Sequence, residues 1–403
     1  MTHDVIVVGA GPAGATAAKV LAENGVSVLL LDKHTFPRDK PCGGGLPTRI
    51  LKRYPYIQKN GLIDSYSHRL CVHSTSLQNQ AHLDHPEPIV AMVRRPTFDA
   101  GLVTLATDSG ADLKAGVAAT RITTTKYRAH VTLNDGTFTP ASYVIVATGM
   151  GSRITRDLGY HLSHRHIGAC ILEEYPVPRP VMDQVFGEDR CIHILLNVLG
   201  IAGYGWVFPK KDHVNIGLCE FYQALPRRRL KKNLKQLYPQ FITLLKDHKI
   251  IPDTVTVGSP RGGVFPTLPQ DQTYGDCTLL CGDAGGLVNP LTGEGIYYAM
   301  VSGELAARTV LHALKEGDPN TSSLFQYQRL WMRDFGDDYR TFYRVSRQWW
   351  NPAETLVRII EQDPQLKELA LSLVMGPTKV RDIRWTIGRR LIIGYVKARL
   401  GRF

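Results

Sequence analysis

The sequence lacks the features that mark several protein classes. Its seven cysteines are an odd number, are widely spaced and form no CxxC pair, which favours neither a disulfide framework nor a zinc site. No segment reaches the roughly 18 uncharged apolar residues that a membrane-spanning helix needs. The N-terminus lacks the basic region and the unbroken apolar run of a signal peptide. We therefore expect a cytoplasmic protein that is soluble or held at the membrane face, with reduced thiols and no bound metal.

The chain also has little negative charge to oppose its Lys and Arg residues, and its net charge is +12 over 403 residues. Basic residues gather at 227–232 and at 379–402, where only Asp382 opposes them. No zinc-finger spacing or RNA-binding strand motif accompanies these clusters, so nucleic acid ranks last among the anionic partners. The cluster at 227–232 could be a solvated helix face, or it could bind an acidic ferredoxin or a substrate phosphate.

The first residues have the pattern of a nucleotide site. Asp4–Val8 predicts a buried strand that leads into the glycine motif of residues 9–14 and then into an alanine-rich helix. The helix N-terminus offers unpaired N–H groups to a pyrophosphate. A second strand, 26–31, ends at Asp32, where a carboxylate can bind ribose hydroxyls and disfavours a 2′-phosphate.

Two later segments predict that the nucleotide domain is interrupted and completed late in the chain. Residues 143–149 and 278–286 are each a short apolar run that ends among small residues. A second dinucleotide motif is missing, because Gly149-Met-Gly151 has Ile154 where the third glycine should be. A nicotinamide cofactor, if used, would bind only transiently.

These motifs together resemble the flavoprotein group that includes para-hydroxybenzoate hydroxylase. The matching segments are Arg95-Pro-Thr-Phe-Asp99, Ala147-Thr-Gly149 and Gly282-Asp283-Ala284, after the glycine motif. The resemblance implies FAD, with Arg95 near its pyrophosphate or ribose and Asp283 near its ribitol or diphosphate. Taken alone, Asp283 also fits a turn or a helix cap.

The segment after Asp283 predicts a helix that runs through Arg308. Its glycines free the backbone where the helix N-terminus could face the flavin, although an ordinary start capped by Thr292 fits as well. The residues expected to contact FAD are Gly9, Ala10, Gly11, Pro12, Ala13, Gly14, Asp32, Lys33, Cys42, Gly43, Gly44, Arg95, Ala118, Ala147, Thr148, Gly149, Gly282, Asp283, Pro290, Gly293, Gly295 and Ile296.

An aromatic segment and a cysteine loop give the resemblance more detail. Residues 203–210 and 213–220 read as a hairpin in which Tyr204, Trp206 and Phe208 share one face, either as plain sheet core or as the wall of a site. YGWVFP together with PRDKPCGGGL resembles the geranylgeranyl reductase family, over about residues 1–310.

This resemblance implies an FAD-dependent reductase that saturates C=C bonds of geranylgeranyl or polyprenyl chains. Hydride would come from N5 of reduced FAD, and ferredoxin or NAD(P)H would be the electron donor. Cys42 is the expected proton donor and Tyr204 the alternative, because a thiol and a phenol are both mostly protonated at neutral pH. Trp206 is expected to shape the pocket. The expected substrate contacts are Gly44, Gly45, Tyr204, Trp206 and Phe208.

The glycine triplet 43–45 has two interpretations. It could let the backbone pass close to the isoalloxazine ring or change conformation, or it could be a flexible surface loop with an incidental cysteine.

Other functions also remain open. WxWxIP of flavin halogenases is similar to YGWVFP, so a monooxygenase or halogenase fits, as does a lycopene-cyclase-like enzyme without net redox chemistry or a lipid-binding flavoprotein.

The expected architecture is α/β, with a Rossmann-type FAD-binding domain in two stretches, 1–160 and 265–315. An antiparallel-sheet substrate domain, 161–264, lies between them, and a helical region, 316–403, follows. In the last helix, apolar residues recur at three- and four-residue intervals with Arg and Lys between them. That helix either docks on the protein or lies on anionic lipid. Its expected apolar residues are Val380, Ile383, Ile387, Leu391 and Tyr395.

Overall fold

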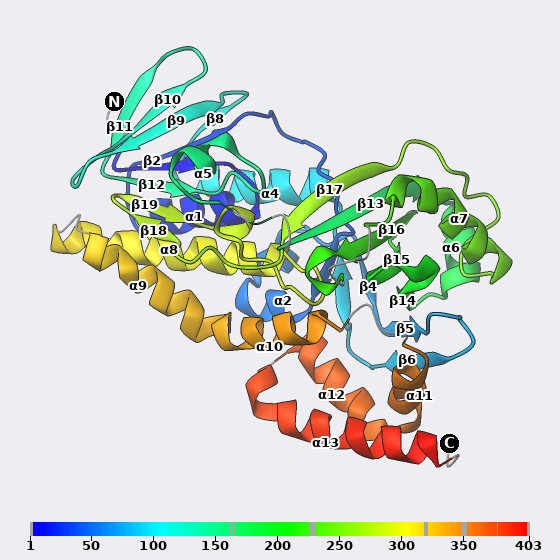
Figure 1. Ribbon diagram of the computed structural model, residues 1–403. Coiled ribbons are helices and arrows are strands. Elements are labelled where there is room, and N and C mark those ends of the chain that lie inside the picture. The colour runs from blue at the N-terminus through cyan, green and yellow to red at the C-terminus, as the bar shows by residue number, and fades with distance from the viewer. Residues whose placement is uncertain are drawn as a thin grey trace. The chain divides into compact units, whose positions relative to one another are not determined.

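The computed structural model describes residues 3–161, 163, 166–225, 231–317, 321–348, 353–376 and 378–400 (Figure 1). Most of the first basic cluster, Arg227 to Arg229, lies outside these ranges. The chain forms two compact units. Unit 1 comprises residues 1–40, 95–167 and 265–343, and unit 2 comprises residues 41–94, 168–264 and 344–403.

Unit 1 is built on a six-stranded sheet in the order β18, β19, β12, β1, β2, β8. In that order the strands are Tyr274–Gly275, Thr278–Leu280, Tyr143–Val146, Val5–Val8, Val28–Asp32 and Asp112–Ala115. All neighbouring pairs are parallel except β18 with β19. The central strands are buried throughout and apolar up to Asp32, the last residue of β2, as expected for a parallel sheet covered by helices on both faces.

The helices of unit 1 come from all three of its chain segments. Helix α1 packs against both α4 and α8, and an added Cβ at Gly303 of α8 would lie 2.1 Å from the carbonyl oxygen of Ala13. A separate small sheet comprises β9 (Ala119–Thr124), β10 (Ala129–Leu133) and β11 (Phe138–Ala141). The helices are α1 (Pro12–Glu23), α4 (Arg95–Asp108), α5 (Arg153–Asp157), η3 (Gly282–Gly285), α8 (Ile296–Glu316), α9 (Thr321–Trp331), η4 (Met332–Gly336) and α10 (Asp337–Ser346), which runs past the end of the unit.

Unit 2 is built on a seven-stranded sheet in the order β17, β13, β16, β15, β14, β5, β6. In that order the strands are Arg261–Pro266, Ile167–Pro176, His213–Phe221, Gly203–Pro209, Ile192–Leu196, Arg69–His73 and Gln80–Asp84. The expected hairpin is confirmed, since β15 pairs antiparallel with β16. A small second sheet joins β3 (Gly45–Pro47), β7 (Val90–Met92) and β4 (Ser65–Ser67).

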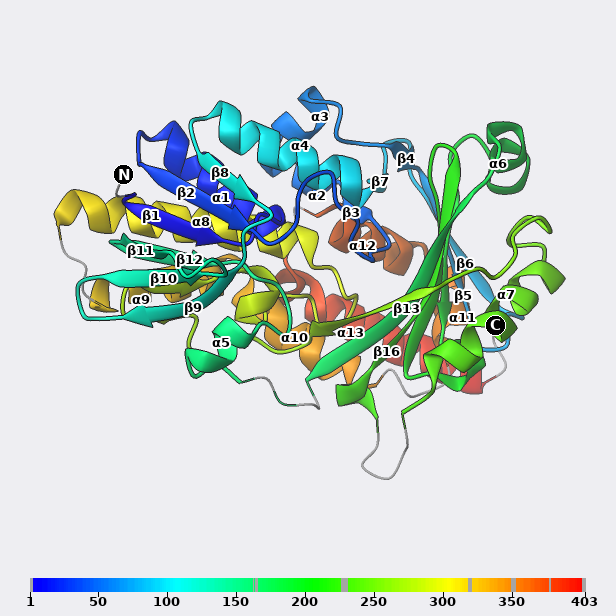
Figure 2. The same ribbon diagram turned by 90° about the horizontal axis from the view of Figure 1, so that it is seen from above.

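The two faces of the seven-stranded sheet are covered by different helices. One face packs against α6 (Arg179–Phe186) and α7 (Leu234–Asp247), which Figure 2 shows beside the sheet, with side chains such as Leu195, Val207 and Phe241 between them. On the other face, Leu196 and Tyr204 pack towards Val357 of α11 (Glu354–Gln362). The remaining helices are α2 (Arg49–Arg53), α3 (Tyr56–Lys59), η1 (Val198–Gly200), η2 (Tyr222–Ala224), α12 (Pro364–Met375) and α13 (Val380–Arg399).

The boundaries of the two units differ from the domain boundaries that the sequence analysis expected. Residues 41–94 lie in unit 2, although the sequence analysis assigned them to the FAD domain. The reason is strand pairing, because β5 extends the seven-stranded sheet by pairing in parallel with β14. The region 316–403 is helical as expected, but it is shared between the two units. Among the residues described, none of the helices is long and apolar enough to span a membrane.

Candidate active site

The turn between β1 and α1 requires glycine at two positions, Gly9 and Gly14. Gly9 has a φ of +103°, and a Cβ there would lie 2.3 Å from the carbonyl oxygen of Ala147. A Cβ at Gly14 would lie 1.8 Å from the carbonyl oxygen of Gly9. At Gly11 the nearest atom to an added Cβ is Nη2 of Arg38, 3.5 Å away. The turn is therefore closed on its inner side and open at Gly11, where the backbone can approach a ligand.

The first turn of α1 keeps its N–H groups available. The helix begins at Pro12, Gly11 is its N-cap, and no side chain of a described residue caps it. Ala10 and Ala13 are buried beside it. Unpaired N–H groups at a helix N-terminus attract anions. This geometry fits a pyrophosphate.

Asp32 stands at the end of β2 as expected. The N–H of Ala10 donates to its Oδ2 over 2.8 Å, and the N–H of His34 donates to its Oδ1 over 2.9 Å. These bonds orient the carboxylate. Each of its oxygens can still accept a hydrogen bond from a hydroxyl group. Lys33, the next residue, is exposed.

Arg95 is buried and is held by a partner that sequence reasoning missed. Its Nε and Nη2 donate to the two carboxylate oxygens of Asp99, both over 2.7 Å. Arg38 contacts the same carboxylate from another segment, with Nη2 3.0 Å from Oδ2 of Asp99. A fully buried carboxylate therefore fixes two guanidinium groups. The i, i+4 spacing of Arg95 and Asp99 on a predicted helix is the signal that could have revealed this pair.

The late segments of the chain complete unit 1. The N–H of Gly282 donates to Oγ of Ser302 over 2.9 Å, and Oδ2 of Asp283 lies 3.7 Å from Nζ of Lys40. Thr148, between Ala147 and Gly149 at the end of β12, has a buried hydroxyl without a partner among the described residues. Ala118 is half-buried and directly precedes β9.

The start of α8 differs from a Thr-capped helix. Gly295 is the N-cap and no side chain of a described residue caps the helix, so that alternative is wrong. Thr292 accepts instead from the N–H of Glu294 within the preceding turn. Asn289, which sequence reasoning missed, organises this turn, since its Oδ1 accepts from Leu291 and Thr292 over 2.9 and 3.2 Å. Pro290 and Gly293 lie in the same turn, and Ile296 is the first residue of α8.

The aromatic residues of β15 form a row in unit 2. Ring centroids are 6.1 Å apart for Tyr204 and Trp206 and 6.2 Å apart for Trp206 and Phe208. Trp206 lies against Gly217 of β16, where an added Cβ would be 2.2 Å from the indole ring. The three side chains share one face of the sheet, as predicted, and only Trp206 is fully buried.

The Cys42 loop packs against this aromatic row. A Cβ at Gly43 would lie 3.0 Å from Cε2 of Phe208, and one at Gly45 would lie 3.1 Å from the same atom. Gly44 has a φ of +77°, and the N–H of Val93 donates to its carbonyl oxygen over 2.8 Å. The glycines are thus required by close packing and by one left-handed backbone position, and the flexible surface loop is not what forms.

Asn215 connects the loop to the aromatic row. The indole N–H of Trp206 donates to Oδ1 of Asn215 over 2.9 Å, and Nδ2 of Asn215 donates to the carbonyl oxygen of Cys42 over 3.1 Å. The Cys42 thiol is free and half-buried. Sequence reasoning missed Asn215, although a polar residue in the middle of an apolar strand is a signal of this kind.

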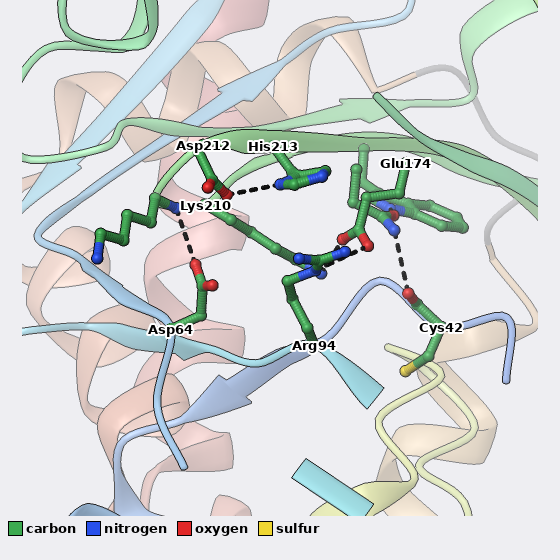
Figure 3. Close-up of polar contacts among 10 residues, drawn as sticks. Cys42, Asp64, Arg94, Glu174, Lys210, Asp212 and His213 are labelled. Carbon is green, nitrogen blue, oxygen red and sulfur yellow. Dashed lines mark hydrogen bonds and ion pairs between the residues drawn. The ribbon is translucent and has the colours of Figure 1, made fainter. Parts of the chain in front are cut away.

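A charged group beside the loop was also missed. Lys210 is 2% exposed and its ammonium contacts Glu174, whose other oxygen lies 3.4 Å from Nε of Arg94. Figure 3 shows Arg94, Glu174 and Lys210 together. A Cβ at Gly44 would lie 3.0 Å from Nζ of Lys210. A buried ammonium is stable only when paired, so this group helps to hold the loop in place.

Comparisons with known proteins agree with this geometry. Residues 2–250 match the family described as "FAD binding domain". The chain is 33% identical, over 86% of its length and 90% of the relative, to digeranylgeranylglycerophospholipid reductase 1 of Methanopyrus kandleri. It is 30% identical, over 85% of its length and 82% of the relative, to menaquinone reductase of Mycobacterium tuberculosis.

A solved structure is similar over nearly the whole fold. The crystal structure of a geranylgeranyl bacteriochlorophyll reductase-like protein from Thermoplasma acidophilum superposes with a TM-score of 0.80 at 23% identity, over 95% of this chain and 98% of the other. At this identity the likeness concerns the fold. The glycine cradle, the oriented Asp32 carboxylate and two uncapped helix N-termini all fit FAD in unit 1.

Proposed function

The chain belongs to the geranylgeranyl reductase family of FAD-binding oxidoreductases, and from this premise we propose that it saturates C=C bonds in the prenyl chain of an isoprenoid lipid. The observation that carries the proposal is the hydrogen-bonded chain from Trp206 through Asn215 to Cys42, next to a row of aromatic rings. The two relatives named above support a glycerophospholipid or a menaquinone as the carrier of the prenyl chain.

Unit 1 provides the residues that would hold FAD. The N-terminus of α1 takes the diphosphate, and Asp32 accepts from the ribose hydroxyls. Arg95, fixed by Asp99, supplies a guanidinium for the diphosphate or ribose. Asp283 and the uncapped start of α8 are assigned to the ribitol and the flavin ring. Ala118, the Ala147–Gly149 turn and the residues of the 290–296 turn complete the set.

Unit 2 provides the environment that an isolated alkene needs. Reduced FAD, when bound, supplies a hydride equivalent. No carbonyl polarises a prenyl double bond, so proton and hydride transfer share a transition state with carbocation character. The faces of Tyr204, Trp206 and Phe208 stabilise positive charge and exclude water. The thiol of Cys42, held through its backbone by Asn215, carries the proton at Sγ, and the hydroxyl of Tyr204 is the alternative donor.

The electron donor is proposed to be external. Because the sequence has no second dinucleotide motif, NAD(P)H would bind transiently, and a ferredoxin would need only a basic contact surface. An assay of the half-reaction with chemically reduced flavin needs no electron donor.

Helix α13 supports the finer proposal of contact with a membrane. The face predicted to be apolar is mostly turned inwards: Val380 is buried, Ile383 and Ile387 are half-buried, while Tyr395 is exposed. A second stripe, spaced by seven, four and four residues, is exposed, and five basic residues surround it on α13. The stripe is Trp385, Ile392, Val396 and Leu400, which are 79%, 67%, 53% and 61% exposed. The basic residues are Arg381, Arg384, Arg389, Lys397 and Arg399. Such a face suits an anionic lipid surface.

Liposome sedimentation tests the membrane contact separately from the reaction. The double variant W385S/I392S should lose binding to vesicles that contain anionic lipid and keep its FAD. The control is Phe138→Ser, which removes an equally exposed apolar side chain, 58% exposed, from β11 of unit 1. Equal binding by wild type and W385S/I392S would remove α13 from the membrane contact.

The reaction is tested anaerobically with chemically reduced flavin. Geranylgeranyl diphosphate, a geranylgeranylated glycerolipid and menaquinone are each incubated with the protein, and product mass is recorded after reoxidation in air, which removes the two hydrogens that a quinone ring takes up. Gains of two hydrogens per reduced bond with flavin reoxidation are expected. An unchanged mass with a changed structure would indicate an isomerase, and a product that forms only with oxygen would indicate a monooxygenase or halogenase.

The role of Cys42 is tested in the same assay. Cys42→Ala should keep FAD and lower the rate about 10²- to 10⁴-fold, the range typical of a lost acid catalyst. Cys170→Ser, at another half-buried thiol of unit 2 that forms no disulfide, is the control. An undiminished rate in Cys42→Ala would leave Tyr204 as the proton donor.

A further inference from the structure

A second group of reactive side chains lies on the opposite face of the seven-stranded sheet. Cys71 and His73 are two residues apart on β5 and therefore share a face. His193 of β14 is in register with Cys71. Its neighbour Ile194 is in register with Trp206, so His193 and Trp206 project to opposite faces. The group is therefore separate from the aromatic row.

The three side chains converge on one point. Nε2 of His73 lies 2.9 Å from Nδ1 of His193. The Cys71 thiol and one nitrogen of each ring all lie within 4.8 Å of one another. Cys71 is 1% exposed and His73 is 2% exposed, so water has little access from their side. This is the spacing of ligand atoms around a shared centre.

The protein's own hydrogen bonds leave this group incomplete. Nδ1 of His73 is buried and has no partner among the described residues. A buried ring nitrogen without a partner is unfavourable, and it calls for an explanation such as a bound ion.

We propose that Cys71, His73 and His193 form a zinc-binding site. One thiolate and two imidazoles are a ligand set that suits Zn²⁺, and the fourth position is open to water or to the side-chain oxygen of Gln80, which lies 3.8 Å from the Cys71 sulfur. Binding forms a Zn–S bond as the thiol proton leaves to solvent, with no change in oxidation state.

The site would fasten two distant parts of the chain. Cys71 and His73 belong to the segment 41–94, which also carries the Cys42 loop, and His193 belongs to the segment 168–264. The strands already pair, and a shared ion would add a bond between their side chains. No sequence motif reveals the site, because C-x-H and a histidine 120 residues away have no recognisable spacing.

The test uses the full-length FAD-loaded protein, stripped with a chelator and titrated with ZnCl₂ and then with CoCl₂. One equivalent of Zn²⁺ should bind and raise the melting temperature of the wild type. Co²⁺ should give a thiolate-to-cobalt charge-transfer band and the visible bands of a tetrahedral ion. Cys71→Ser should abolish the charge-transfer band, and Cys71→Ser, His73→Gln and His193→Gln should each bind Zn²⁺ at least about tenfold more weakly.

Two controls keep the test decisive. Cys170→Ser removes a half-buried thiol from β13 of the same sheet, and His68→Gln removes an imidazole just before β5. Both should bind one equivalent like the wild type. Retained flavin absorbance shows that unit 1 of each variant is folded, and an unchanged far-UV circular dichroism spectrum shows the same for the sheet of unit 2. A wild type that binds no Zn²⁺, a cobalt spectrum without the thiolate band, or an affinity unchanged in all three variants would overturn the site.

Discussion

The indole N–H of Trp206 donates to Oδ1 of Asn215 over 2.9 Å, between the paired strands β15 and β16. Asn215 is 2% exposed, and its Nδ2 donates to the backbone carbonyl oxygen of Cys42. A single buried amide thus couples an aromatic ring to the loop that carries the proposed proton donor.

Asn215→Leu should weaken this coupling. It leaves the Trp206 N–H unpaired and the Cys42 carbonyl oxygen without its donor, so unfolding should become easier by about 1–3 kcal/mol. We expect FAD binding to be kept and kcat to fall more than KM rises. Trp206→Phe removes the N–H and replaces the indole with a smaller ring. If Trp206 and Asn215 act as a unit, the double variant loses less than the sum of the two single losses, and additive losses would show that they act independently.

Gly217→Ala should displace the Trp206 ring. The added Cβ would lie 2.2 Å from the indole, a distance that real structures do not tolerate. We expect a loss of about 1–3 kcal/mol in stability from overpacking, and altered tryptophan fluorescence. Gly262→Ala on β17 is the matched control, because its Cβ would meet nothing closer than 3.5 Å. Equal melting temperatures for both variants would contradict this packing.

Asp99→Asn should weaken FAD binding. It removes the carboxylate that fixes Arg95 and Arg38, and breaking a buried ion pair costs about 3–5 kcal/mol. Dialysis followed by flavin absorbance should show cofactor loss. The control, Asp84→Asn, breaks an exposed pair with Arg69 whose N···O distance is 2.9 Å, and should change little. Full FAD retention in Asp99→Asn would mean that Arg95 keeps its place without this partner.

Asp363→Asn should loosen α13. Asp363 caps α12 through the N–H groups of Gln365 and Leu366 and pairs with Arg390 of α13. The hydrogen bond from Arg390 lowers the pKa of Asp363 below its usual value of 3.8. The pair therefore stabilises the folded state above that value, and its contribution is lost as pH falls below it. Hydrogen exchange should show faster exchange in α13 of the variant at neutral pH, and unchanged protection would refute the contact.

Much of the fold could be predicted from local patterns in the sequence. The strand, turn and helix of residues 5–23 and the hairpin of 203–221 were predictable because each depends on residues close together in the chain. Arg95, Asp32 and the Cys42 loop were proposed from motifs. The contact of Arg38 with Asp99 and that of Asn215 with Cys42 join distant segments, so the sequence did not predict them.

What sequence reasoning missed depends on strand register. Asn215, Glu174 and Lys210 meet the Cys42 loop only because β13, β15 and β16 lie side by side in one sheet. The Cys71, His73 and His193 group arises from a parallel pairing across about 120 residues. Neither the periodicity of one strand nor the spacing of one motif specifies which strand will be its neighbour.

Strand β14 serves both faces of its sheet with alternate residues. His193 points to the face of α6 and α7, while Ile194 and Leu196 pair with Trp206 and Tyr204 on the other. Inserting or deleting one residue here would send the imidazole into the aromatic row and an isoleucine into the cysteine and histidine group. This strand can vary in side chain but hardly in length, so length variation in this sheet belongs at the turns.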